Sequence, residues 1–391
     1  MDQIIREGVI MRVLPITSQR RPVVDGLIAL SMLGVLLGGP TGAAAADALV
    51  ERANRGVVEI VAGSVYGADV RMVEDLATVL DDGATRRILP LIGKGSVQNL
   101  LDLRLLRGTD LAIVQTDVLD AVKAQRPELE NSISYVAKLY TAELHLLARG
   151  DIATVGDLAG KSVSFGSEGD GTGVTAAKIF ALLKIKVQPV SYDPLLALDK
   201  LKSGDIAAMA YVSAKPAPLF ATVRRQDGVH FLAIPLQKEI DEAYLPARLA
   251  DTDYPGILAG QSPVDTVAIG TVLLAVNFAV GSERYRNVAN FVDAFFTQFP
   301  KLLEAPRQAK WNEVNLAAEL PNWHRFAPAD AWIKRNAGAP AVVNEQRLRE
   351  IFGKFLDERS KAAGTAMTAA QKDQLFEQFK HWQGSQGSST P

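Results

Sequence analysis

Hydrophobic and polar positions repeat in one order along much of the chain. Residues 56–80 begin with alternating apolar positions, pass through a small-residue loop, and end with apolar residues at helical spacing. The same order recurs at 86–105, 109–122 and 160–184. Strands that alternate with helices of this length form βα units and mainly parallel sheets. The pattern predicts an α/β protein, in which ligands bind where the carboxyl ends of strands meet helix N-termini.

Two long apolar segments, 142–150 and 267–277, predict that the chain forms two lobes. Both read as extended and lack nearby hairpin partners, as expected of strands that leave one lobe and later return to it. The residues between them contain further strands at 187–192, 206–213 and 229–234, with a helix at 193–204. We therefore expect two sheets, each mainly parallel and flanked by helices, with lobe 1 at 57–145 and 266–325 and lobe 2 at 146–265.

The C-terminal part of the chain is predicted to be helical. Residues 285–304 form a strongly periodic helix, and a helical extension is expected over 326–383. Its helices are placed at 344–361 and 368–382, the second opened by a capping box from Thr368 to Gln371. The composition of residues 384–391 predicts a disordered tail.

The N-terminus has the three parts of a secretory signal. Arg20 and Arg21 precede an apolar run at 27–37, and small residues suited to cleavage follow. The run is shorter than the roughly 20 residues that a membrane helix needs. We expect residues 1–46 to be removed near Ala46, which leaves a periplasmic protein without a membrane span. An uncleaved helix, a start at Met11 and a twin-arginine signal are the alternatives.

Composition excludes several classes of function. The chain has 391 residues, no cysteine and a formal net charge of -2. Thiol catalysis, disulfides and thiolate metal sites are therefore excluded. Because there is no global basic field, nucleic acid is not an expected partner.

Three glycine-rich loops open predicted helices, at Gly63–Gly67, Gly93–Ser96 and Gly166–Thr172. The first N–H groups of a helix lack internal partners, so such loops could hold a carboxylate or a phosphate. The third loop lacks the Lys-Ser/Thr ending of a nucleotide P-loop and fits the dinucleotide fingerprint poorly. Tight βα turns without a ligand are the alternative.

Catalytic patterns are scarce. The four histidines are scattered without metal-ligand spacing, and no nucleophile elbow occurs. We therefore expect a binding protein, with no enzyme activity, metal or cofactor.

From Glu59 to Leu316 the chain resembles the TAXI family of solute receptors, which serve tripartite (TRAP) membrane transporters. The resemblance is carried by residues 62–77, 93–118, 137–176, 215–220 and 266–275. It implies a two-lobed, type II periplasmic-binding fold that closes over a small solute by hinge motion. Solutes of this family are mainly glutamate-like molecules or 2-oxoacid dicarboxylates.

Four residues depart from the family pattern, namely Asp69, Lys94, Asp170 and Lys215. A carboxylate that faces a dicarboxylate would weaken its binding, so the usual class of solute is in question. In the alternative interpretation, Asp69 and Asp170 cap helices and face away, and Lys94 is solvated.

The resemblance and the loops together define an expected ligand site. Gly95, Ser96 and Asn99, with residues 169–172, would hold an anionic end, while Asp69 or Asp170 could accept from an amino group. Tyr66, Gln115 and Lys215 would orient the solute. The full set of expected ligand-binding residues is Gly63, Ser64, Tyr66, Asp69, Lys94, Gly95, Ser96, Asn99, Gln115, Asp117, Gly169, Asp170, Gly171, Thr172 and Lys215.

The expected function is capture of a small polar or anionic solute, carboxylate or amino-acid-like, for a TRAP-type transporter. An ABC-type importer, a periplasmic sensing or adaptor role, and an enzyme on the same fold are the alternatives. We expect a monomer whose partners are the solute and the TRAP membrane subunits.

Overall fold

The computed structural model describes residues 54–336. It also describes residues 47, 50–52, 352–353, 356, 368–373 and 375–376. The predicted signal segment before residue 47, the tail at 384–391 and most of the predicted extension lie outside the described residues. Within the extension, Gln371 donates its backbone N–H to Thr368 Oγ1 (3.3 Å), and Thr368 donates its own N–H to Gln371 Oε1 (2.9 Å). The predicted capping box is therefore confirmed.

Among the described residues, ten strands form one sheet. They are β1 (Val57–Ala62), β2 (Arg87–Ile92), β3 (Leu111–Gln115), β4 (Ile133–Arg149), β5 (Ser162–Ser164), β6 (Gln188–Val190), β7 (Ala208–Ser213), β8 (Val229–Phe231), β9 (Leu245–Leu249) and β10 (Val264–Val276). The strand order is β2-β1-β3-β10-β4-β7-β5-β6, with β8 added to β4 and β9 added to β10.

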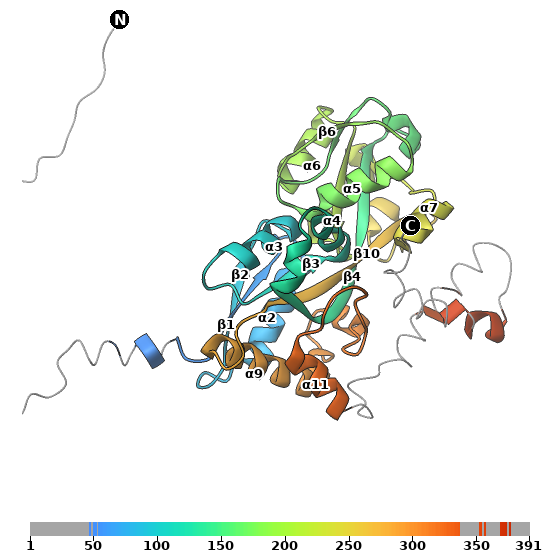
Figure 1. Cartoon of the computed structure of the whole chain (residues 1–391). Coiled ribbons are helices and arrows are strands. Elements are labelled where there is room, and N and C mark those ends of the chain that lie inside the picture. Colours follow the sequence, from blue (N-terminus) through green and yellow to red (C-terminus); the bar gives the residue numbers. More distant parts are fainter. Residues whose placement is uncertain are drawn as a thin grey trace, which may run out of the picture. The chain divides into compact units, whose positions relative to one another are not determined.

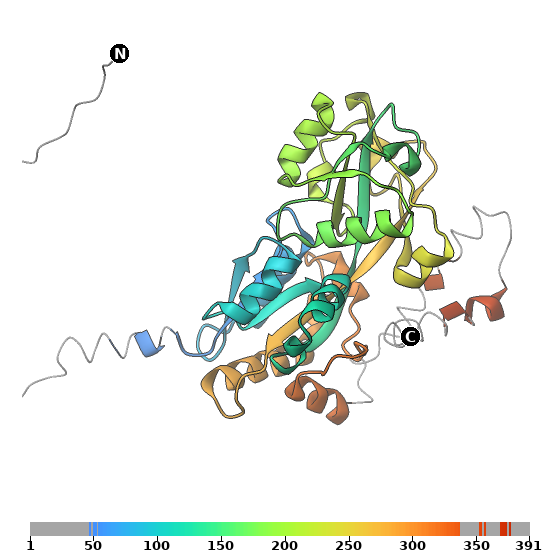
Figure 2. The same ribbon diagram turned by 45° about the horizontal axis from the view of Figure 1, so that its top comes forward.

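Helices flank this sheet (Figures 1 and 2). The α-helices are α2 (Ala68–Leu80), α3 (Ser96–Leu105), α4 (Thr116–Gln125), α5 (Gly171–Leu182), α6 (Pro194–Ser203), α7 (Lys238–Ala243), α8 (Pro255–Leu258), α9 (Glu283–Thr297), α10 (Phe299–Leu302) and α11 (Ala327–Arg335). Short 3₁₀ helices are η1 (Pro127–Asn131), η2 (Val155–Leu158), η3 (Pro218–Phe220), η4 (Arg225–Asp227) and η5 (Ala309–Glu313). The α/β class predicted from the repeating units is confirmed.

Strands β4 and β10 connect two groups of elements. The first group consists of β1–β3 with α2–α4, and the second consists of β5–β8 with α5–α8. β3 pairs with the end of β10, whereas β7 pairs with the later part of β4. Figure 1 shows α5 and α6 near one end of β4, and α2 and α9 near the other. The lobe boundaries remain a prediction.

The sheet differs from the expectation in one respect. Instead of two separate sheets, one hydrogen-bonded sheet runs through both groups, because β4 and β10 pair with each other and with strands of both groups. Pairing is parallel among the outer strands β1–β2, β1–β3, β5–β6 and β5–β7, but β4 and β10 pair antiparallel with their neighbours.

Burial explains why the helices lie where they do. Helix α2 places Met72, Val73, Leu76 and Leu80 at helical spacing, and all four are buried against the sheet. In α9 the buried ring of Phe295 packs against Trp311, with ring centroids 5.9 Å apart. The part of the chain that the structure describes contains no helix long and apolar enough to cross a membrane.

Candidate functional site

An open cavity of about 860 Å³ lies at the start of α2. Its walls come from both groups of elements, since α2 belongs to the first group and the segments before η3 and around α8 belong to the second. The lining residues are Gly67, Ala68, Arg71, Ala214, Lys215, Pro216, Ala217, Pro218, Phe220, Ala221, Arg224, Asp253, Tyr254, Pro255, Gly256, Ile257 and Gln308.

The lining of this cavity is electropositive. It carries the cationic side chains of Arg71, Lys215 and Arg224 against one carboxylate, that of Asp253. The N-cap of α2, Gly67, makes no capping hydrogen bond through a side chain. The positive end of this helix already has a carboxyl group beside it, because Asp69 lies in the first turn of α2. The cavity is suited to an anion because cationic side chains outnumber carboxylates in its lining.

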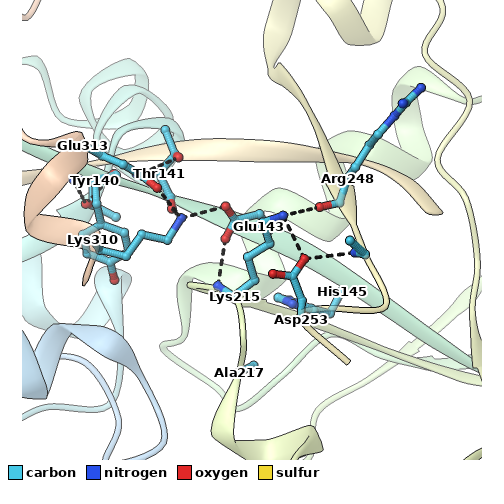
Figure 3. A network of polar contacts seen from close by, with 12 residues as sticks. Tyr140, Thr141, Glu143, His145, Lys215, Ala217, Arg248, Asp253, Lys310 and Glu313 are labelled. Carbon is cyan, nitrogen blue, oxygen red and sulfur yellow. Dashed lines mark hydrogen bonds and ion pairs between the residues drawn. The ribbon is translucent and has the colours of Figure 1, made fainter. Parts of the chain in front are cut away.

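The charge of Lys215 is offset by a neighbouring carboxylate, that of Asp253. Its ammonium group donates to Asp253 Oδ2 (2.9 Å) and to the carbonyl of Arg248 (2.7 Å). Its backbone N–H donates to Glu143 Oε2 (3.0 Å). Figure 3 shows that these contacts fix Lys215 between β4 and the segment that precedes α8. Arg71 and Arg224 add positive charge to the lining, and Arg224 Nη1 also donates to the carbonyls of Ala221 (2.8 Å) and Val223 (3.0 Å).

Beside Lys215, a buried ion pair joins Lys310 to Glu143 of β4 (Figure 3). Lys310 Nζ is 2.7 Å from Glu143 Oε1 and 2.8 Å from Glu313 Oε1, and it also donates to the carbonyl of Thr141 (2.8 Å). Burial raises the pKa of Glu143, an effect that Lys310 opposes. Burial alone would lower the pKa of Lys310, but the two carboxylates raise it. Lys310 is therefore held as a cation.

A buried histidine also supports the cavity wall. His145 Nε2 is 2.5 Å from the hydroxyl of Tyr254, which accepts the N–H of Ala217 (2.8 Å). Burial lowers the pKa of His145 to about 4, so the ring is neutral near pH 7. Among the side chains described by the structure, no group of three or more His, Asp or Glu residues is placed to hold a metal ion.

Of the predicted ligand-binding residues, Lys215 lines the cavity. The second and third glycine-rich loops, which carry most of the others, contact one another directly. The N–H of Gln98 donates to the carbonyl of Gly169 (3.0 Å). A Cβ on Gly95, whose φ is 129°, would lie 2.8 Å from Asp170 Cα, and one on Gly171 would overlap the Gln115 side chain. The structure thus brings Gly95, Gln115, Gly169, Asp170 and Gly171 together.

Several predicted residues make internal hydrogen bonds. Asn99 is fully buried, and its Nδ2 donates to the carbonyls of Ala62 (2.9 Å) and Ile113 (3.1 Å). Ser96 Oγ accepts from the N–H of Gln115 (3.0 Å). These bonds join the ends of β1 and β3 to the start of α3.

Two further predicted residues join other elements. Asp117 Oδ2 accepts from Thr175 Oγ1 (2.7 Å) and from the hydroxyl of Tyr244 (3.1 Å), so it connects α4 to the second group. Burial raises the pKa of Asp117. Thr172 Oγ1 accepts the N–H of Val212 (3.2 Å).

The two added carboxylates are held in different ways. Asp170 is the N-cap of α5 and accepts the N–H of Thr172 (3.2 Å), as the capping alternative expects. Burial raises the pKa of Asp170 to about 6. Asp69 lies in the first turn of α2 rather than at its cap, and its Oδ1 accepts from the hydroxyl of Tyr140 (2.6 Å). Burial also raises the pKa of Asp69.

The remaining predicted residues lie in the first and second loops. Ser64 Oγ accepts the N–H of Tyr66 (3.2 Å), which closes the first loop. A Cβ on Gly63 would lie 2.7 Å from Asp69 Oδ2, so this glycine allows the carboxylate to approach the backbone. Lys94 is exposed, in agreement with the solvated alternative.

Sequence reasoning missed Arg71, Arg224, Asp253 and Gln308 as cavity residues. They lie in four separate segments, and their meeting depends on the tertiary fold. The local signal was the set of prolines at 216, 218 and 255, because prolines begin both η3 and α8.

Comparison with known proteins gives one family match. A family model described as NMT1-like family matches residues 62–320. A search of curated proteins finds no match.

Several solved structures are also similar. The periplasmic aliphatic sulphonate binding protein SsuA from Escherichia coli is 16% identical, with 83% of this chain and 92% of that chain covered and a TM-score of 0.38. MatC from Rhodopseudomonas palustris with bound malate is 16% identical. The match covers 71% of this chain and 97% of that chain, with a TM-score of 0.42. A structure described as a periplasmic transporter is 12% identical. The match covers 75% of this chain and 96% of that chain, with a TM-score of 0.45.

Proposed function

Because the chain belongs to the NMT1-like family, we propose that it is an exported solute-binding receptor without enzyme activity. It captures a small polar or anionic solute, of the carboxylate or amino-acid-like class, and passes it to a TRAP-type membrane transporter. The observation that carries the proposal is the electropositive cavity whose walls come from both groups of elements.

Arg71 and Arg224 have the main role in this capture. Arg71 lies on α2 in the first group, and Arg224 follows η3 in the second, so one anion could contact both groups. Arginine guanidinium groups bind carboxylates through two parallel hydrogen bonds. Micromolar affinity corresponds to about 8 kcal/mol, which a cavity with a few directed polar groups can supply.

The glycine-rich loops have a second role in the proposal. Asp69 and Asp170 would accept from an amino group of the solute, while Gly95, Ser96 and the start of α5 would contact its carboxylate. In this arrangement the amino-bearing solutes require the start of α3 and the third loop to separate, because Gln98 of α3 and Gly169 are hydrogen-bonded.

Binding is tested by thermal unfolding of the purified protein with a panel of carboxylates, sulfonates, amino acids, sugars and polyamines. We expect a subset of the anions to raise the melting temperature. The variant with Arg71→Ala and Arg224→Ala should lose that increase, whereas Arg104→Ala, which removes an exposed arginine of α3, should keep it. No increase with any compound would overturn the proposal.

The membrane partner is tested separately. The tagged protein, loaded with a solute found in the first experiment, is recovered from detergent-solubilised membranes of the producing cells. Recovery of TRAP membrane subunits supports the proposal. Recovery of an ABC-type ATPase complex, or of a sensor protein alone, would replace the TRAP assignment by one of the two alternatives.

A further inference from the structure

We infer that the solute of this cavity carries an apolar body of several carbon atoms beside its anionic group. The inference rests on the proposed function and concerns the same cavity. Its basis is the composition of the cavity lining, which combines cationic side chains with exposed apolar ones.

The apolar part consists of Pro216, Pro218 and Pro255, which we call the proline shelf. All three are exposed and line the cavity. Phe220, Tyr254 and Ile257 lie in the same wall and are themselves buried. An exposed apolar surface next to a charged site gains free energy when a ligand covers it.

The proline shelf is held by its surroundings. Pro218 begins η3 and Pro255 begins α8. The N–H of Ala217 donates to the Tyr254 hydroxyl (2.8 Å), which fastens the two segments together. The rings of Phe220 and Tyr254 are in contact behind it, with centroids 6.2 Å apart. A preformed surface of this kind loses little conformational entropy when a ligand binds.

The charges of the cavity favour one negative group over several. Asp253 lies on the same wall as the proline shelf and already neutralises Lys215. A second carboxylate placed over the shelf would lie near Asp253 and would leave the apolar surface without a partner. A monoanion with an aliphatic or aromatic body uses both the two arginines and the shelf.

The test compares butyrate, hexanoate and gluconate by isothermal titration calorimetry on the purified protein. All three carry one carboxylate, and gluconate has the six carbons of hexanoate with hydroxyl groups along its body. We expect hexanoate to bind more tightly than butyrate, by up to about fourfold for each methylene that becomes buried, and at least tenfold more tightly than gluconate.

The shelf itself is tested with Pro218→Ser and Pro255→Ser. Together these should remove most of the preference for hexanoate over gluconate. The matched control is Pro127→Ser, because Pro127 is also exposed and also begins a short helix, η1, but does not line the cavity. It should leave the preference unchanged.

The outcomes separate this inference from the proposed function. If the three anions bind with affinities within twofold of one another, the inference is wrong and anion capture stands. If hexanoate is preferred but the two shelf variants keep the preference, the shelf is not its cause and the inference is again overturned. If neither these anions nor any compound of the panel binds, the proposed function fails as well.

Discussion

Lys310 and Glu143 form an ion pair of 2.7 Å in which the two side chains are only 7% and 4% exposed. Lys310 belongs to η5, and Glu143 lies in the central strand β4, where it also receives the N–H of Lys215 from the cavity wall. One carboxylate therefore connects the segment after α10 to the segment that lines the cavity. Removing one partner of such a pair leaves a buried charge without compensation.

The first prediction concerns this pair. Lys310→Met should lower the free energy of unfolding by about 3–5 kcal/mol, because Glu143 would stay buried without its main cation. The combined variant Lys310→Met with Glu143→Gln should recover part of the loss. Urea unfolding measures both. Lys334→Met, which breaks the exposed pair with Asp330, should change stability by less than about 1 kcal/mol. Equal losses for Lys310→Met and Lys334→Met would show that the buried pair has no special role.

The second prediction concerns the pH dependence that Asp170 contributes. Because burial raises its pKa in the folded protein to about 6, the folded state binds more protons than the unfolded state between about pH 4 and 6. This contribution to stability is present below pH 4 and is lost as the pH rises through 6. Asp170→Asn keeps a capping side chain and removes the titrating group. The free energy of unfolding of this variant, relative to that of the wild type, should therefore increase as the pH rises, by at most about 3 kcal/mol.

The Asp170 effect is measured by urea unfolding of both proteins from pH 4.5 to 7.5. Burial also raises the pKa of Asp69 and Asp117, so the informative quantity is the difference in the free energy of unfolding between variant and wild type. A constant difference across this range would contradict the prediction.

The third prediction concerns the hydrogen bond between Thr175 and Asp117, which joins α5 to α4 at 2.7 Å. Thr175→Val keeps the shape of the side chain but leaves the buried carboxylate with one donor fewer, and should cost about 1–3 kcal/mol in the free energy of unfolding. Thr78→Val is the control, since the hydroxyl of Thr78 is exposed and bonds only within its own helix. Chemical denaturation of the three proteins gives the comparison, and equal stability of the two variants would contradict the prediction.

The fourth prediction separates a structural role of Asn99 from a ligand-binding role. Asn99→Asp is nearly isosteric, but it places a carboxylate oxygen against the carbonyls of Ala62 and Ile113 in a fully buried site. We expect a loss of about 3 kcal/mol or more, measured by thermal and urea unfolding without solute. Asn131→Asp, at an exposed asparagine, is the control. An Asn99 variant as stable as the control would mean that the amide is free to serve a ligand.

Local periodicity was enough to predict most of the fold. Helix α2 and strand β1 were predicted because their apolar spacing differs clearly, and both lie within the predicted unit 56–80. The full length of β4 was not predicted. Its residues are buried on both faces from Ile133 onward, so the alternation that marks a half-exposed strand is missing. The single continuous sheet was missed for the same reason, since it depends on the pairing of β4 with β10.

The candidate site was harder to predict. A sequence does not distinguish polar residues at a helix N-terminus that bind a ligand from those that bind the protein's own backbone. Asn99 and Ser96 form hydrogen bonds with the backbone. The cavity depends on Arg71 and Arg224, which are far apart in the chain and belong to no motif. Only the packing of the two groups of elements brings them to one surface.

The hydrogen bond from Gln98 to Gly169 has a consequence for how affinity is set at the glycine-rich loops. The donor is the third residue of α3, one of the N–H groups that a helix cannot satisfy internally. This N–H group already donates to the carbonyl of Gly169 in the second group, so that carbonyl competes with a solute for the same donor. A solute that reaches this helix end exchanges one acceptor for another, and its net gain is the difference between the two bonds. Under the proposed function, this helix end would therefore select acceptors stronger than a peptide carbonyl, and a charged oxygen is the simplest of these.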